Sequence, residues 1–220
     1  METSLLLVTV ILSALVATSY SISCVKCIGL SGLQCSGPVE RCPSADDACI
    51  SMYTVIMIDG VGESKTFLRD CGNRSSCPSA MSLSNTIVKS RTGITCCFSD
   101  SCTPSQPTTP PEYYNKNGVR CKTCYDLSDK PCQTDEFMDC LGEEKKCISQ
   151  VSSVKVGSSG QVSEGMRGCA TQDMCNIRLI DKTFGEVTMN SHITCTDGTA
   201  GLHYNWLLLL ISASLLLKFI

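Results

Sequence analysis

Cysteine is the residue whose number and spacing give this chain its greatest capacity for chemistry. Eighteen cysteines occur in 220 residues, and two CxxC units stand out, Cys24 with Cys27 and Cys121 with Cys124. Such units ligate zinc, act as thiol redox couples or form disulfides. Zinc requires further ligands in compatible spacing. A thiol redox couple is typical of a cytosolic protein or of an oxidoreductase with a βαβ fold, not of a secreted repeat. Because the number is even and the N-terminus predicts secretion, we expect every cysteine to be in a disulfide, with no metal and no cofactor.

Nucleophilic catalysis requires an activated Ser or Cys beside a base, most often His. The chain has two histidines, His192 and His203. We expect His203 to be removed with the C-terminal tail and His192 to lie on the surface of a terminal strand. The acidic pairs Asp46–Asp47 and Asp135–Glu136 are adjacent, so on an extended chain their side chains face different ways. The sequence therefore predicts that the protein is not an enzyme.

Charge excludes another class of function. The formal net charge is −3, and the lysines and arginines form no basic cluster of the kind that binds nucleic acid. We expect no nucleic-acid partner.

One N-glycosylation sequon is present, Asn73-Arg74-Ser75, whereas Asn85-Thr86-Ile87 and Asn190-Ser191-His192 lack the third-position hydroxyl. It lies in a short connection between two cysteines, which we expect to be exposed. The sequence predicts Asn73 as a glycosylation site.

The first residues have the layout of a secretory signal peptide. They are apolar from Leu5 to Ala17, and small residues follow up to Ser21, although Glu2 stands where a basic residue is usual. The apolar run is too short for a membrane span, which needs about 20 residues. We expect residues 1–21 to be removed.

Internal repetition organises the rest of the chain. The eight cysteines from Cys24 to Cys96 are separated by 3, 8, 7, 7, 22, 6 and 19 residues, and the eight from Cys121 to Cys195 by 3, 8, 8, 7, 22, 6 and 20. This agreement indicates two copies of one domain. The second copy lacks counterparts of Cys97 and Cys102, so we expect these two to pair with each other. For the other eight in each copy, spacing alone leaves 105 connectivities open.

The elements that position these cysteines are predicted to be β-hairpins. Ile50–Ile58 is rich in β-branched residues, and a glycine-containing turn returns the chain to Cys71; Ile148–Val156 and a return to Cys169 repeat this plan. A third hairpin is expected within 87–95 in one copy and 177–194 in the other. Because only 5% of the residues are aromatic, neither copy has the means to bury a large core, and cross-links must compensate.

Four prolines lie in the segment between the copies, which predicts an extended, semi-rigid spacer and two separate domains. The expected organisation is a signal peptide at 1–21, a first domain at 22–102, a Pro-rich linker at 103–118, a second domain at 119–197 and a removed tail at 198–220.

The initial CxxC, the three hairpins and the CCFSDSC ending of the first copy resemble the three-finger family of the urokinase receptor and lymphocyte antigen six. The resemblance covers nearly the whole mature chain and implies an all-β, disulfide-rich fold of two tandem three-finger (snake-toxin-like) domains. It also implies these disulfides: Cys24–Cys49, Cys27–Cys35, Cys42–Cys71, Cys77–Cys96, Cys97–Cys102, Cys121–Cys147, Cys124–Cys132, Cys140–Cys169 and Cys175–Cys195. The second copy lacks the closing loop of the family, so we expect a less tightly closed base there.

Within this family, the stretch CLGEEKKC, a following finger and a GC dipeptide are similar to gamma-type phospholipase A2 inhibitors. This resemblance implies a secretory phospholipase as a second possible partner.

The C-terminal residues are typical of a glycosylphosphatidylinositol (GPI) anchor signal. Small residues at 197–201 precede a short spacer and the apolar run WLLLLISASLLLKFI. As a helix, that run would reach about 22 Å, less than a hydrocarbon core of about 30 Å. We expect attachment at Asp197 or Gly198 and display on the extracellular face of the plasma membrane.

Strand alternation places Tyr53, Val55 and Met57 on one face of the central finger of the first domain. These are the predicted ligand contacts, although packing against the neighbouring finger would also explain the pattern. The expected function is a GPI-anchored receptor, co-receptor or adhesion module that binds an extracellular or cell-surface protein. The alternative is a secreted inhibitor of secretory phospholipase A2, and a structural cell-coat protein is a third hypothesis.

Overall fold

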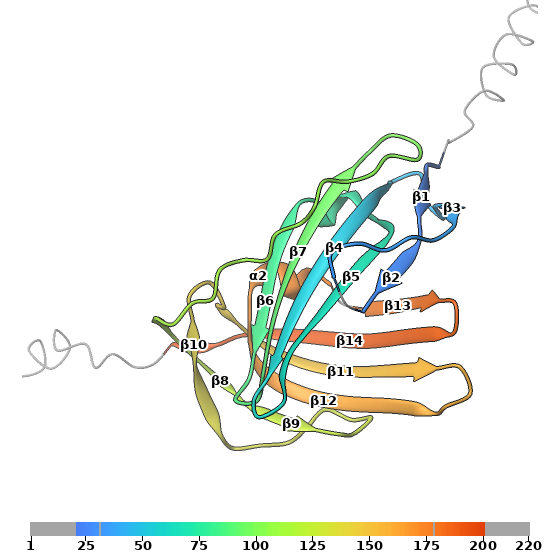
Figure 1. Cartoon of the computed structure of the whole chain (residues 1–220). Helices are drawn as coiled ribbons and strands as arrows, with labels where there is room; N and C mark the ends of the chain where they lie inside the picture. The colour runs from blue at the N-terminus through green and yellow to red at the C-terminus, as the bar shows by residue number, and fades with distance from the viewer. Residues whose placement is uncertain (1–20, 31, 178, 201–220) are drawn as a thin grey trace, which may run out of the picture. The chain divides into compact units, whose positions relative to one another are not determined.

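The computed structural model describes residues 21–30, 32–177 and 179–200. This part of the chain forms two compact units (Figure 1). One contains the residues up to Thr54, Lys65–Ser79 and Gly93–Thr108, and the other contains Val55–Ser64, Ala80–Thr92 and the chain from Thr109. Residues 1–20 of the predicted signal peptide and 201–220 of the predicted tail lie outside the described residues.

The first cysteine repeat forms short strands near its start and four longer strands after them. The neighbouring strands follow the order β6-β7-β4-β5-β2, and β1 pairs separately with β3. The elements are β1 (Ser23–Val25), β2 (Cys27–Gly29), β3 (Val39–Arg41), β4 (Asp47–Ile58), β5 (Gly62–Asn73), the 3-10 turn η1 (Arg74–Ser76), β6 (Ser79–Ser84) and β7 (Val88–Cys97).

The second cysteine repeat forms four long antiparallel strands in the order β13-β14-β11-β12, which Figure 1 shows in orange tones. Strand β9 adds to β12, and β8 pairs with β10 on one side and β15 on the other. The elements are β8 (Lys116–Lys122), β9 (Cys124–Asp126), β10 (Phe137–Leu141), β11 (Lys146–Val156), β12 (Gln161–Ala170), α2 (Gln172–Asn176), β13 (Leu179–Phe184), β14 (Val187–Asp197) and β15 (Thr199–Ala200).

The expectation of an all-β, disulfide-rich fold is confirmed, since helical structure among the described residues is limited to α2 and η1. No helix in this part of the chain is both long and apolar enough to cross a membrane. All eighteen cysteines are paired. The bonds join Cys24–Cys49, Cys27–Cys35, Cys42–Cys71, Cys77–Cys96, Cys97–Cys102, Cys121–Cys147, Cys124–Cys132, Cys140–Cys169 and Cys175–Cys195, which are the pairs that the family resemblance implies.

Disulfides make up much of the buried interior. One buried cluster consists of Cys24, Cys42, Cys49 and Cys71, and a second of Cys121, Cys140 and Cys169. A third, conventional cluster contains Leu83, Ile148, Met166, Ala170 and Ile193. Cross-links therefore supply cohesion where apolar side chains are few.

The segment between the repeats, which its prolines predict to be an extended, semi-rigid spacer, lies against β7. Pro104 and Pro107 are buried. At Gly93 in β7, an added Cβ would come within 2.0 Å of the Thr108 carbonyl oxygen, so glycine is what permits this approach. Farther along, an Arg91 Nη1–H donates to the Pro110 carbonyl at 3.2 Å. Gly93 therefore indicates a close contact at this point of β7, which the proline content of the segment does not indicate.

Candidate functional site

The three predicted ligand contacts differ in accessibility. Tyr53 is half-buried in β4, Val55 is 6% exposed, and Met57 is 43% exposed near the end of the strand. Val55 and Met57 line a cavity of about 50 Å³. The cavity is small and opens partly to solvent.

Charged groups line the same cavity. Glu144 is 6% exposed, and its Oε2 accepts a hydrogen bond from Ser84 Oγ at 2.5 Å. Lys89 Nζ donates to Glu112 Oε1 at 3.2 Å, which lowers the pKa of Glu112. Burial raises the pKa of Glu144, although the bonds from serine hydroxyls and the charge of Lys89 oppose the rise. The charged groups that line the cavity are thus bonded to neighbours within the chain.

A second surface consists of exposed apolar residues on paired strands. At the tips of β11 and β12, Val154 pairs directly with Val162, and on the other side Val154 and Val156 pair with Met189 and Val187 of β14. Directly opposed residues share a face of the sheet, so these five side chains form one apolar surface. Val154, Val156 and Val162 are 41%, 48% and 66% exposed. We call this set (Val154, Val156, Val162, Val187 and Met189) the fingertip patch.

The two faces of the sheet at this tip differ sharply in polarity. By strand alternation, the face opposite the fingertip patch presents polar residues. These are Ser153, Lys155, Ser163, Thr188 and Asn190. The exposed apolar residues at this tip therefore lie on one face of the sheet.

Hydrogen bonds fix the sheet between the fingertip patch and the buried cluster of Leu83, Ile148, Met166, Ala170 and Ile193. Gln150 Nε2 donates to Ser152 Oγ at 2.7 Å and to Ser191 Oγ at 3.0 Å, and the two serine hydroxyls are 3.0 Å apart. These side-chain hydrogen bonds join β11 to β14 in addition to the backbone pairing of the two strands. The valines therefore lie on strands that are joined by both backbone and side-chain hydrogen bonds.

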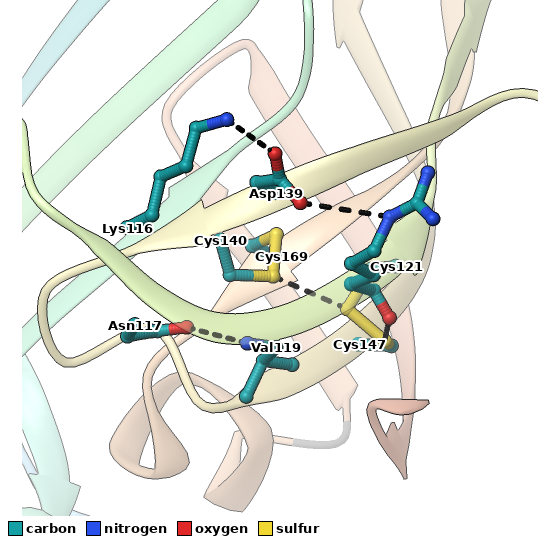
Figure 2. Close-up of polar contacts among 9 residues, drawn as sticks. Lys116, Asn117, Val119, Cys121, Asp139, Cys140, Cys147 and Cys169 are labelled. Carbon is teal, nitrogen blue, oxygen red and sulfur yellow. Dashed lines mark hydrogen bonds and ion pairs between the residues drawn. A yellow bond between two sulfur atoms is a disulfide. The ribbon is translucent and has the colours of Figure 1, made fainter. Parts of the chain in front are cut away.

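The base of these fingers is equally constrained (Figure 2). The Cys121 and Cys140 sulfur atoms of two neighbouring disulfides lie 3.4 Å apart. Above them, the Asp139 carboxylate forms ion pairs with Lys116 Nζ at 2.6 Å and with Arg120 Nε at 3.5 Å. The hydrogen bond from Lys116 lowers the pKa of Asp139. A cross-linked base limits the ordering entropy that the fingers lose on binding.

The predicted anchor residues lie at the end of β14. Asp197 is exposed and forms an ion pair with Lys146, which lowers the pKa of Asp197. Gly198 is half-buried, and β15 follows it and pairs with β8. Strand β14 stays paired with β11 down to Asp197, so the missing closing loop does not fray this strand.

The remaining predicted residues do not converge on a catalytic or metal site. His192 is exposed on β14, and Asn73 is exposed at the start of η1. The close groups of cysteine sulfurs are all disulfide sulfurs, not the thiolates that bind zinc.

The fingertip patch was missed by sequence reasoning, although a signal for it was present. Val154-Lys155-Val156 alternates apolar and polar residues up to the Gly157–Gly160 turn, and Val162 follows that turn at a matching position. Pairing across the hairpin places Val154 and Val162 together. What the sequence does not give is that the described part of the chain leaves these valines exposed.

The profile of the u-PAR/Ly-6 domain matches the chain twice, over residues 20–105 and 117–200. The chain belongs to the u-PAR/Ly-6 domain family. This family comprises non-enzymatic binding proteins and inhibitors, so the chain is not an enzyme. Its disulfide-rich u-PAR/Ly-6 domains are those of an extracellular protein.

Several named proteins are similar to these u-PAR/Ly-6 domains. "Phospholipase A2 inhibitor NAI" of Notechis ater is 29% identical over 174 residues, covering 78% of this chain and 84% of that protein. "Phospholipase A2 inhibitor PIP" of Malayopython reticulatus is 25% identical over 160 residues, with 71% and 77% covered. "Protein RoBo-1" of Rattus norvegicus is 27% identical, with 50% and 43% covered. The crystal structure of mouse TEX101 matches with a TM-score of 0.35 and 15% identity, over 80% of this chain and 99% of that one.

Proposed function

We propose that this protein is a GPI-anchored binding protein of the cell surface, which recognises a protein ligand through its fingers. The observation that carries the proposal is the fingertip patch, a contiguous apolar surface on a cross-linked scaffold. An exposed apolar sheet face suits a protein partner, because small molecules bind in concave sites that bury most of their surface.

The position of the fingertip patch along its strands supports display away from a membrane. Strand β14 runs through eleven residues from Val187, in the patch, to Asp197, a proposed attachment residue. At about 3.3 Å per residue, the two ends lie roughly 33 Å apart along the strand. An anchor at Asp197 or Gly198 would leave the patch accessible to a protein on a facing cell or in solution.

The anchor itself is tested by expressing the full-length chain in animal cells and adding phosphatidylinositol-specific phospholipase C. We expect the surface signal to fall and the protein to appear in the medium. A resistant surface signal would reject the anchor, and protein already in the medium before treatment would favour a secreted role.

Ligand recognition is tested with the protein released in this way. The released protein is assembled into tetramers as a reagent, and the binding of these tetramers to a panel of animal cells is measured. The double variant Val154→Ser/Val162→Ser removes exposed apolar surface without touching the buried cluster, and we expect binding to fall at least tenfold. The matched control is Ser153→Ala/Ser163→Ala on the opposite face. Equal binding by both variants would reject the fingertip patch as the ligand-binding surface. Tyr53→Ala and Met57→Ala test the contacts predicted from sequence.

A second candidate function is inhibition of secretory phospholipase A2. It is favoured by the similarity to the inhibitors of Notechis ater and Malayopython reticulatus, which extends over most of both chains. The test is the activity of a purified secretory phospholipase A2 with and without this protein. Inhibition that the Val154→Ser/Val162→Ser variant abolishes would assign that enzyme as the ligand of the patch, whereas unchanged activity would reject this candidate.

A further inference from the structure

The connection between β5 and β6 contains an exposed turn that has no part in the proposed ligand binding. Asn73, Arg74 and Ser75 are all exposed, and Asn73 caps the 3-10 turn η1. We propose that Asn73 carries an N-linked oligosaccharide in the mature protein, and that this glycan covers the neighbouring Arg74–Phe98 surface.

The turn brings the two functional groups of the sequon together. The backbone N–H and the hydroxyl of Ser75 each donate to Asn73 Oδ1 at 2.8 Å. The side-chain amide is therefore held at the surface with the required hydroxyl beside it. In Asn190-Ser191-His192, by contrast, Ser191 is buried and the third residue has no hydroxyl.

The surroundings of the turn favour a sugar. Disulfides flank it on both sides, from Cys71 to Cys42 and from Cys77 to Cys96, and such bonds form in the secretory pathway, the compartment in which N-linked sugars are added. The Arg74 guanidinium lies over the Phe98 ring, 5.1 Å from its centroid, and Phe98 is 50% exposed. A glycan on the adjacent residue would shield this aromatic ring from solvent and from other molecules.

The reaction is a glycosyl transfer without any change of oxidation state. The Asn73 Nδ2 forms a bond to the anomeric carbon of N-acetylglucosamine in a lipid-diphosphate-linked oligosaccharide. The bond from that carbon to the diphosphate oxygen breaks, and the lipid diphosphate leaves with the electron pair. The amide nitrogen loses one proton to solvent or a base of the transferase.

The experiment uses the full-length chain secreted or displayed by animal cells and treated with peptide-N-glycosidase F. We expect a single downward mass step of one oligosaccharide and conversion of Asn73 to Asp in the released peptide. Asn73→Asp keeps the side-chain oxygen that accepts from Ser75 and removes the acceptor nitrogen, so it should fold and show no step. Ser75→Ala should also lose the step, Ser75→Thr should retain it, and the matched control Asn190→Gln should leave it unchanged.

An unmodified Asn73 peptide in the secreted chain would overturn the proposal, as would a mass step that persists in Asn73→Asp. Shielding is measured separately, as binding of an apolar fluorescent dye to the protein before and after glycan removal. We expect increased binding after removal, and a smaller increase in Phe98→Ser. The same increase in both would overturn the assigned covering role.

Discussion

Ser84 and Glu144 are sixty residues apart in the sequence, yet the Ser84 hydroxyl donates to the Glu144 carboxylate at 2.5 Å. They are joined in one compact unit that contains residues 80–92 together with the chain from Thr109. Around them, Leu83 and Ser84 of β6 pair with Ala170 and Cys169 of β12, and the Thr171 N–H donates to the Ser82 carbonyl at 3.0 Å. A strand that the sequence assigns to the first repeat therefore completes the sheet of the second.

Replacement of Glu144 by Gln should change how stability depends on pH. Burial raises the pKa of Glu144 above its ordinary value of 4.5, so the folded chain holds this proton more tightly than the unfolded chain. The resulting stabilisation is fully present below pH 4.5 and is lost as pH rises through the folded pKa. In this interval the wild-type unfolding temperature should fall with rising pH, and Glu144→Gln should remove that component.

The measurement is a series of thermal unfolding curves between pH 4 and 8, followed by circular dichroism. Lys89, Arg91 and Glu112 line the same cavity and remain present in both proteins, so the difference between the curves isolates Glu144. Glu143→Gln is the matched control, because Glu143 is exposed and pairs with Lys145. Parallel curves for wild type and Glu144→Gln would contradict the assignment.

Leu83→Ala should destabilise the second repeat even though Leu83 belongs to the first. Leu83 is 6% exposed and packs with Ile148, Met166 and Ile193. Truncation of a buried leucine costs about 2–5 kcal/mol. We expect faster hydrogen exchange at the Ile148 and Ala170 amides, whereas Leu127→Ala, at a site 76% exposed, should leave exchange there unchanged. Exchange unaltered by Leu83→Ala would show that β6 is not part of this core.

The distinction between what sequence predicts and what it does not is physical. The spacing of the cysteines recurs because each disulfide fixes two backbone positions. The repeat and its hairpins can therefore be predicted from the sequence alone. The pairing of β6 with β12 depends on a two-residue ladder and on Gly168, where an added Cβ would come within 2.0 Å of the Ser84 carbonyl oxygen. A glycine in a strand indicates some close approach but does not name the approaching segment. Strand alternation likewise places Val55 on one face of its finger without naming the segment that packs there, and Val55 lies buried.

The nine disulfides should contribute unequally to stability. Cys140–Cys169 closes a separation of 29 residues and both cysteines are fully buried, whereas Cys97–Cys102 closes a separation of only 5. The chain-entropy account makes the longer loop more stabilising by about 1.5 kcal/mol. The double serine variant of Cys140 and Cys169 should therefore unfold at a clearly lower temperature than that of Cys97 and Cys102. Equal unfolding temperatures would indicate that native-state packing, not loop closure, sets these contributions.

Gly93→Ala should detach the segment between the repeats from β7. The added Cβ would come within 2.0 Å of the Thr108 carbonyl oxygen, and because this is a backbone atom, the segment itself must move. Overpacking of this kind costs about 1–3 kcal/mol. The movement also weakens the bond from Thr95 Oγ1 to the Ser105 carbonyl, so limited proteolysis should cleave the segment faster. Ser90→Ala, on the same strand, is the control, and an unchanged cleavage rate in Gly93→Ala would mean that the segment is not held by its contact with β7.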